Sequence, residues 1–385
     1  MTTGANSGRR VVIIGGGIAG LAAALCFART GADVQVFEQA DELREVGAGL
    51  QITPNGGAVL AALGLGAIAD QRSISASALV PVDAMTGETI GRFDLSRLPG
   101  QPYRFFHRAD LLDLLAEGCE RAKVTITLGA KAVEVGETHV RFSNGDTAEG
   151  DLIVGADGLH SVVRPILNGD DKPFFTGQVA WRSVVKVPSS QPEVKIWMGA
   201  GKHVVTYPLV GGRMNIVAVQ ERKEWAAEGW NFFDEPDVLR EVFSDCHQSL
   251  FDLFDQMQTV RRWGLFRHPV AKVWHDHSRA ILGDAAHPTL PFMAQGANLA
   301  LEDAFVMARC LDDDPSVHFG LKAYQAARRS RVNRAIEAAN RNAVNYHLTG
   351  IKRRVAHAGL RTMAQLTPNL FLGRSDWLSN YDVTA

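Results

Sequence analysis

The stretch RRVVIIGGGIAGLAAALCFARTGADVQVFEQ, residues 9–39, carries the strongest indication of the fold class. A β-branched run at 11–14 meets three consecutive glycines at 15–17, and an alanine- and leucine-rich segment then continues to Thr30. This order predicts a strand, a tight turn and a helix, and the alternating pattern that follows predicts a second strand ending at Glu38. Together these segments form one βαβ unit.

The glycines Gly15, Gly17 and Gly20 fit the pattern G-x-G-x-x-G. In this pattern one glycine allows the turn, one lets a pyrophosphate touch the backbone, and one lets helix and strand approach closely. Glu38 lies about 20 residues past the second glycine, where a carboxylate accepts hydrogen bonds from both ribose hydroxyls. A ribose 2′-phosphate would be repelled there, so the site suits FAD or NAD and excludes NADP.

The same residues allow two other interpretations, a transmembrane helix and a signal peptide. Residues 11–28 carry no charge and follow Arg9 and Arg10. Three consecutive glycines would break a membrane helix, and an exported leader would not need Glu38 at ribose spacing. No later stretch is apolar enough to span a bilayer, so we expect no membrane span.

The composition excludes several other classes. The chain has 385 residues, is 46% hydrophobic and carries 40 basic against 42 acidic side chains, so nothing points to nucleic acid. The arginines of a predicted helix over 321–348 are interpreted as a solvated face. The four cysteines are scattered and show no C-x-x-C spacing, which is typical of free thiols in a reducing cytoplasm.

Two later strands each end in an acidic residue. A buried strand at 151–155 leads to Asp157, and another that begins at Ser278 leads to Asp284. Open α/β sheets bind their ligands at the carboxyl ends of such strands. The sequence Gly296-Ala297-Asn298 then opens a helix, and this neutral entry leaves its first N–H groups free for a ligand atom that gains negative charge.

The segments between these strands have other patterns. A glycine-rich passage at 46–55 predicts a loop that passes close to a flat or bulky group, although an ordinary turn-rich connection explains it equally well. Residues 55–69 are predicted to form one helix. Short β-like segments linked by glycine turns predict an antiparallel meander within 173–272. Apolar residues at helix-like intervals predict an amphipathic helical region within 235–258.

Three separated segments resemble the signatures of one family. They are GGGIAGL with Glu38, GADGLHSVVR (155–164) and GDAAHPTLPFMAQGANLALEDA (283–304). They resemble those of the flavin-dependent aromatic hydroxylases, the single-component monooxygenases that include salicylate, 3-hydroxybenzoate and 6-hydroxynicotinate hydroxylases. The similarity extends to the C-terminal Trp-Leu-x-x-Tyr-Asp and covers nearly the whole chain. Three motifs in this order are far more specific than one.

The resemblance implies an α/β fold with a Rossmann-like FAD-binding domain of the glutathione-reductase type, an inserted antiparallel β-sheet substrate domain and C-terminal helices. The implied boundaries are 9–72, 104–172 and 273–311 for the discontinuous FAD-binding domain, 73–103 and 173–272 for the substrate domain, and 312–385 for the C-terminal helical region.

The resemblance also implies cofactor contacts. Gly15, Gly17, Ala19 and Gly20 hold the FAD pyrophosphate, Glu38 the adenosine ribose, and backbone near Val133 the adenine, with Gln39 and Pro291 among the cofactor-binding residues. Arg108 matches an arginine that reaches the cofactor. Asp157 matches an aspartate linked to the pyrophosphate region and to the use of the nicotinamide. Asp284 matches the residue bonded to the ribityl hydroxyls, while Gly296, Ala297 and Asn298 place N–H groups at the flavin pyrimidine edge.

In the implied reaction, NADH or NADPH reduces FAD, O2 adds to give a flavin C4a-hydroperoxide, and its distal oxygen attacks an electron-rich ring. Removing a phenolic proton activates that ring, and a positioned base contributes ~10²–10⁴-fold. The candidate catalytic residues are His203 and Tyr207, which are four apart on a strand and share one face with Val205. Gln51 falls where related enzymes carry a polar or imidazole group, but a neutral amide is no base.

Each of these residues also has a plainer interpretation. A histidine on a strand is often a hydrogen-bonded structural residue, and Tyr207 can belong to the core with its hydroxyl bonded to backbone. His287 is expected to order its loop and not to bind metal, because no second ligand stands at suitable spacing. We therefore expect no metal site.

The leading hypothesis is a cytoplasmic NAD(P)H-dependent FAD monooxygenase, monomeric or homodimeric. Its substrate would be a small hydroxylated aromatic or N-heteroaromatic carboxylate, with or without decarboxylation. One alternative is an oxygenase or reductase of the same scaffold that acts on a non-phenolic or antibiotic-like substrate. Another is a non-catalytic FAD-binding protein that docks a partner through its C-terminal helices.

Overall fold

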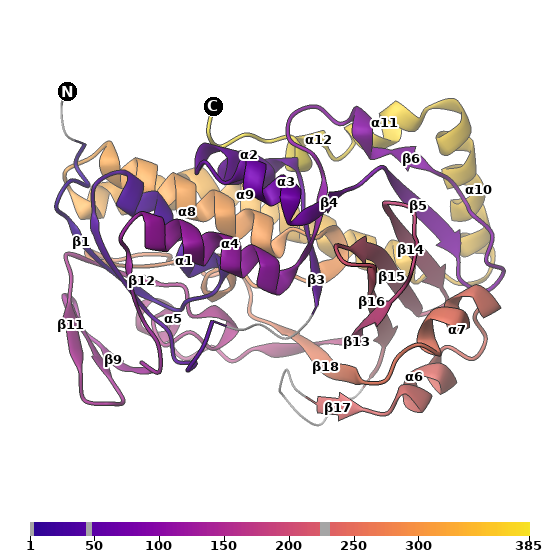
Figure 1. Ribbon diagram of the computed structural model, residues 1–385, viewed down its shortest axis with the longest axis horizontal. Helices are drawn as coiled ribbons and strands as arrows, with labels where there is room; N and C mark the ends of the chain where they lie inside the picture. Colours follow the sequence, from indigo (N-terminus) through magenta and orange to yellow (C-terminus); the bar gives the residue numbers. More distant parts are fainter. Residues whose placement is uncertain (1–3, 44–47, 224–231) are drawn as a thin grey trace.

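The computed structural model describes residues 4–43, 48–223 and 232–385 (Figure 1). Val46 and Gly47 of the predicted glycine-rich loop therefore lie outside the described residues. Among the helices of these ranges, none combines the length and the apolar composition needed to cross a membrane.

Five parallel strands form the first sheet, in the order β19-β12-β1-β2-β8. Their bounds are β1 (Arg10–Ile14), β2 (Asp33–Phe37), β8 (Thr125–Thr127), β12 (Leu152–Gly155) and β19 (Arg279–Ile281). Helix α1 (Ile18–Arg29) contacts both α4 (Arg108–Arg121) and α8 (Gly296–Asp312), and the three lie side by side in Figure 1. Strands covered by helices are buried, which explains the continuous apolar runs of β1 and β12.

The turn between β1 and α1 requires two of its glycines. Gly15 has a φ of 106°, and a Cβ there would lie 2.5 Å from the carbonyl oxygen of Ala156. A Cβ on Gly20 would lie 1.9 Å from the carbonyl oxygen of Gly15. The first turn of α1 thus packs directly on the end of β1, and the predicted βαβ unit is confirmed.

A second sheet has eight strands in the order β17-β18-β13-β16-β15-β14-β5-β6. Neighbouring strands are antiparallel except β14 and β5, which are parallel. The predicted meander is correct for β14, β15 and β16, but β13 pairs with β16 and not with β14. The bounds are β5 (Ala78–Asp83), β6 (Phe93–Asp94), β13 (Phe174–Lys186), β14 (Glu193–Gly199), β15 (Lys202–Leu209), β16 (Arg213–Glu221), β17 (Phe232–Asp234) and β18 (Val260–Arg267).

Two helices from the predicted amphipathic region pack on this sheet. Leu239 and Phe243, at α6 (Pro236–Val242), and Leu250, in α7 (Gln248–Phe254), share a hydrophobic core with Trp181 of β13. The described residues also form two three-stranded sheets. Their strands are β3 (Gly49–Ile52), β4 (Ser73–Ser75) and β7 (Arg104–His107), and β9 (Ala132–Val135), β10 (His139–Phe142) and β11 (Thr147–Glu149).

The predicted single helix over 55–69 is wrong. The segment forms α2 (Pro54–Ala62) and α3 (Gly66–Gln71), because Gly64 between them adopts a φ of 70° that a helix does not accommodate. Short elements elsewhere are α5 (Arg164–Asn168) and the 3₁₀ turns η1 (Leu95–Arg97), η2 (Gly158–His160), η3 (Gly283–Ala285) and η4 (Pro291–Met293).

The C-terminal part is helical, with α9 (Val317–Tyr346), α10 (Gly350–Leu366), α11 (Pro368–Gly373) and α12 (Asp376–Ser379). The predicted solvated arginine face is wrong for Arg328, which is 1% exposed. Its guanidinium pairs with Glu302 at 2.6 Å and with Asp303 at 2.7 Å, both on α8. Arg331 also pairs with Glu302, at 2.6 Å. Buried charges need such partners, so these ion pairs fix α9 against α8.

Candidate active site

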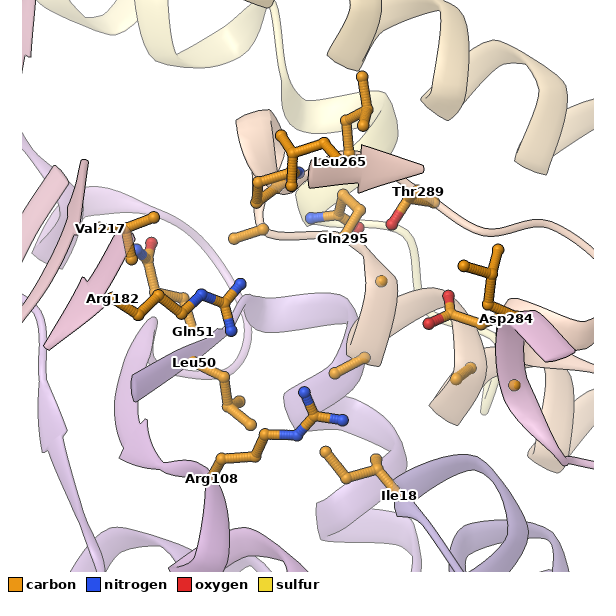
Figure 2. A pocket seen from close by; sticks show the side chains of 18 of the residues that line it. Ile18, Leu50, Gln51, Arg108, Arg182, Val217, Leu265, Asp284, Thr289 and Gln295 are labelled. Carbon is orange, nitrogen blue, oxygen red and sulfur yellow. The ribbon is translucent and has the colours of Figure 1, made fainter. Parts of the chain in front are cut away.

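A cavity of about 320 Å³ lies between the parallel sheet and the eight-stranded sheet (Figure 2). Its walls come from the β1–α1 turn, β3, the start of α4, the loop after β12, several strands of the large sheet and the start of α8. Among the predicted site residues, those on its wall are Gly17, Ala19, Gln51, Arg108, His203, Tyr207, Asp284, Pro291, Gly296 and Ala297.

Two helix N-termini face this cavity. No side chain of the described residues caps α1 or α8, and neither helix has an acidic residue in its first turn. A Cβ built on Gly17 would meet no protein atom within 4 Å, so the space in front of α1 is open. Free N–H groups and the helix dipole make both ends suitable for anionic groups such as phosphates.

Asp284 and Arg108 reach into the same space from different elements (Figure 2). Burial raises the pKa of Asp284, while His287 and Arg108 oppose this shift. Burial and the nearby Arg182 lower the pKa of Arg108 to about 10, and Asp284 opposes that change. The wall therefore offers one acceptor for hydroxyl groups and a cation close to it.

The side chain of Asn298, near the start of α8, forms hydrogen bonds with the backbone of neighbouring segments. Its Nδ2 donates to the carbonyl oxygens of Gln51, at 3.0 Å, and Ala294, at 2.6 Å. Its Oδ1 accepts from the backbone N–H of Thr53 at 3.0 Å. These bonds hold the strand that carries Gln51 against the start of α8.

Seven predicted cofactor residues do not line this cavity, namely Gly15, Gly20, Glu38, Gln39, Val133, Asp157 and Asn298. Glu38 accepts hydrogen bonds from the N–H groups of Gly16, at 2.6 Å, and Ala40, at 2.9 Å, so its carboxylate lies beside the glycine turn. Gln39 is exposed, and Val133 is 48% exposed on β9. One carboxylate oxygen of Asp157 accepts from the N–H of Val162 at 2.7 Å, and the other has no partner among the described residues. Their contacts with the cofactor stay predictions.

The predicted catalytic residues come together on one wall. His203 and Tyr207 are 2% and 3% exposed, and both line the cavity with Val205, as the strand periodicity predicts. Burial and the nearby His347 lower the pKa of His203 well below its ordinary value. Burial raises the pKa of Tyr207. At neutral pH His203 is therefore an uncharged base, and Tyr207 keeps its proton.

Comparison with known proteins identifies the family. The sequence model described as "FAD binding domain" matches residues 9–339. The 3-amino-4-hydroxybenzoate 2-monooxygenase of Streptomyces cremeus is 36% identical over 352 residues, which is 88% of each chain. The chain belongs to the FAD-dependent aromatic hydroxylases. The 3-hydroxybenzoate 6-hydroxylase of Polaromonas naphthalenivorans is 33% identical, and the match covers 97% of the present chain and 96% of the Polaromonas protein.

A solved structure supports the same conclusion. The structure titled "Salicylate hydroxylase substrate complex" superposes on the present chain with a TM-score of 0.80 at 25% identity. The match covers 98% of the present chain and 96% of the salicylate hydroxylase chain. The predicted α/β fold and family resemblance are confirmed. FAD is the cofactor of this hydroxylase, and the open space before Gly17, the uncapped helices and the unpaired Asp157 oxygen all fit its anionic and hydroxyl groups.

A second cavity of about 500 Å³ adjoins the first and is mostly apolar. It lies between strands β5, β14 and β15 and helices α9 to α12. The residues common to both walls are Gln51, Val205, Pro291, Ala294 and Gln295. The two cavities therefore meet at the Gln51 strand and the loop before α8.

Several residues of this hydroxylase site were not predicted. Arg182 lines the first cavity and stacks over the ring of Trp263, 4.6 Å from its centroid. Tyr103 lines the second cavity, and its hydroxyl donates to the side-chain oxygen of Gln51. The only local signal for Arg182 is an arginine among the apolar residues of β13. Tyr103 has no such signal, because its partner is far away in the sequence.

His287 is placed as predicted. Its Nε2 lies 2.5 Å from Oδ2 of Asp303, which also accepts from the N–H of Gly283 at 3.2 Å. His287 thereby fixes the loop that carries Asp284 against α8. Among the described residues, no group of three or more His, Cys, Asp or Glu is arranged to hold a metal ion.

Proposed function

We propose that this hydroxylase uses NADH or NADPH and O2 to hydroxylate a small phenolic or hydroxylated N-heteroaromatic carboxylate, bound where the two cavities meet. The observation that carries the proposal is a buried base and a cation on the wall of one cavity, His203 and Arg182. The two relatives named above act on 3-amino-4-hydroxybenzoate and 3-hydroxybenzoate, which both combine a ring hydroxyl with a carboxylate.

Arg182 is suited to bind the carboxylate. Among the described residues, no acidic side chain forms an ion pair with Arg182. The Nε atom of Arg182 is buried without a hydrogen-bond acceptor. A cation held away from water without an anionic partner is costly, and burial accordingly lowers the pKa of Arg182. A planar guanidinium stacked on Trp263 can form two parallel hydrogen bonds with a carboxylate.

His203 is suited to accept the phenolic proton. When bound, FAD supplies the electrons taken from NAD(P)H and the activation of O2. The chain must provide the remaining requirements, which are an ionised ring oxygen and a dry site. His203 is uncharged and lines the cavity, so it can take the proton. Tyr207 keeps its own proton and can donate a hydrogen bond to the oxygen that becomes negative.

The apolar second cavity is suited to cover the aromatic ring. Leu79, Ile196 and Met198 lie on its wall, together with Tyr103, which is held by Gln51. We further propose a cytoplasmic monomer or homodimer. The free thiols of Cys26, Cys119, Cys246 and Cys310 support the location.

The test is NADH and NADPH oxidation by the FAD-loaded protein with hydroxybenzoates, hydroxypyridine carboxylates and their carboxamides. Phenolic carboxylates should stimulate oxidation, and each carboxamide should be at least ~10-fold weaker, because it lacks the charge that Arg182 would pair. Equal stimulation by acids and amides, or none by any phenol, would contradict the proposal.

A further inference from the structure

Two histidines connect the cavity to the protein surface. Nδ1 of His203 lies 2.7 Å from Nε2 of His347, and Nδ1 of His347 lies 2.8 Å from Oε1 of Glu221. His203 and His347 are 2% and 5% exposed, whereas the side chain of Glu221 is 54% exposed. A continuous row of hydrogen bonds thus runs from the cavity wall to solvent.

The three side chains come from three separate elements that the backbone ties together. His203 lies near the start of β15, Glu221 ends β16, and His347 follows the last residue of α9. The N–H of Gly201 donates to the carbonyl oxygen of His347 at 3.2 Å, and the N–H of Glu221 donates to the carbonyl oxygen of Gly201 at 2.9 Å. The alignment of the side chains is therefore supported by main-chain bonds.

The carboxylate determines the tautomers of both rings. An ionised Glu221 only accepts hydrogen bonds, so Nδ1 of His347 carries a proton. Nε2 of the neutral His347 is then an acceptor, and Nδ1 of His203 must donate to it. This leaves the lone pair of His203 on Nε2, so this nitrogen is the one able to accept a proton from a ligand.

His203 needs an exit for the proton that it accepts. Besides His347, the described groups that face it are the rings of Phe292 and Tyr346, with centroids 5.4 and 5.2 Å away, and Tyr207 and Arg182 on the cavity wall. None of these is an anion. Burial and His347 keep the pKa of His203 low, so a lasting imidazolium there is unfavourable. Burial also lowers the pKa of His347, but Glu221 opposes this shift.

We propose that His203, His347 and Glu221 form a proton relay between the substrate and solvent. The inference rests on the proposed function, since it takes His203 as the base. The substrate O–H bond breaks as its proton binds Nε2 of His203. The Nδ1 proton of His203 moves to Nε2 of His347, and the Nδ1 proton of His347 moves to Glu221 and then to water. The same relay, run in reverse, returns one proton to the product oxygen.

In this relay His203 is the catalytic residue, and His347 and Glu221 are positioning residues that act through it. The test is the ionisation of a bound phenol in the oxidised, FAD-loaded protein, without NADH. The probe is 3-hydroxy-4-nitrobenzoate, whose phenolate absorbs visible light. Stopped-flow mixing gives the rate at which phenolate forms, its pH dependence and its solvent isotope effect, while the flavin spectrum gives the Kd.

Glu221→Gln is the informative variant, because its amide oxygen can still accept from His347 but cannot take up a proton. We expect phenolate formation at least ~10-fold slower, with a shifted pH profile. The Kd should change by less than about fivefold, as expected for an exposed charge. Asp245→Asn is the matched control, since Asp245 is 50% exposed and pairs with Lys202, the neighbour of His203. It should behave as the wild type.

The outcomes separate the relay from the proposed function. A wild-type rate in Glu221→Gln, or an equal loss in Asp245→Asn, would overturn the relay while leaving His203 as the base. A probe that does not bind, or a wild-type rate in His203→Gln, would refute the proposed function and the relay with it. Slow ionisation confined to His203→Gln, His347→Gln and Glu221→Gln would support both.

Discussion

Alanine at Gly17 should separate cofactor binding from folding. Gly17 has a φ of −75° and a ψ of −176°, which alanine adopts freely, and its added Cβ would meet no protein atom within 4 Å. The apoprotein should lose only about 0.5 kcal/mol at this N-cap position. The methyl group would, however, occupy the space before the N–H groups of α1. Losing one hydrogen bond to a charged phosphate costs about 1.5–3 kcal/mol, so the Kd for FAD should rise ~10- to 150-fold.

Alanine at Gly20 is the matched comparison. Its Cβ would lie 1.9 Å from the carbonyl oxygen of Gly15, and a backbone atom cannot move aside as a flexible side chain can. Overpacking of this kind costs about 1–3 kcal/mol, so this apoprotein should unfold at a lower temperature and also bind FAD poorly. Thermal unfolding followed by circular dichroism and FAD titration followed by fluorescence test both variants. Wild-type FAD affinity in Gly17→Ala would show that FAD does not occupy the space before α1, and equal destabilisation of both apoproteins would show that Gly17 is as tightly packed as Gly20.

Three further predictions follow from the site and from the buried ion pairs. His203→Gln should lower the hydroxylation rate at saturating substrate ~10²–10⁴-fold while the FAD content stays unchanged, as measured by product formation and the flavin spectrum. Arg182→Met should raise the Kd of a hydroxybenzoate by at least ~10-fold but leave that of its carboxamide unchanged in a flavin titration. Burial would raise the pKa of Asp303, but His287 and Arg328 outweigh this effect and hold it below the ordinary 3.8. The stability that this carboxylate contributes is therefore present above pH 3.8 and is lost as the pH falls further. Asp303→Asn should remove that part of the pH dependence and destabilise the fold by about 3–5 kcal/mol in urea unfolding at pH 7.

The features that could be predicted from the sequence are those determined by neighbouring residues. The turn at 15–17 depends on glycine conformations within one βαβ unit, and the free helix entry at 296–298 depends on three consecutive residues. The placement of His203 and Tyr207 on the same face of one strand follows from the two-residue period of a strand. Each of these patterns is complete within about 30 residues of the chain, so the sequence contains the whole signal.

The features that were missed depend on contacts between distant segments. Arg328 resembles its exposed neighbours on α9, and only the position of Glu302 and Asp303 on another helix makes it a buried ion pair. His347 lies far from His203 in sequence, and Glu221, although it ends the next strand, has no motif of its own. The pairing of β13 with β16 likewise depends on the sheet as a whole. Such contacts follow from tertiary packing, which periodicity and propensity do not describe.

In the proposed reaction, a phenolic carboxylate ionises in the cavity lined by His203 and Arg182 and is then hydroxylated. The most direct measurement is the amount of hydroxylated product formed per NADH or NADPH oxidised, with 3-hydroxybenzoate and 3-amino-4-hydroxybenzoate as first substrates. We expect nearly one product per nicotinamide for at least one phenolic carboxylate, and a fall towards zero in His203→Gln. Oxidation that yields only hydrogen peroxide with every phenolic carboxylate would show that the protein does not hydroxylate them.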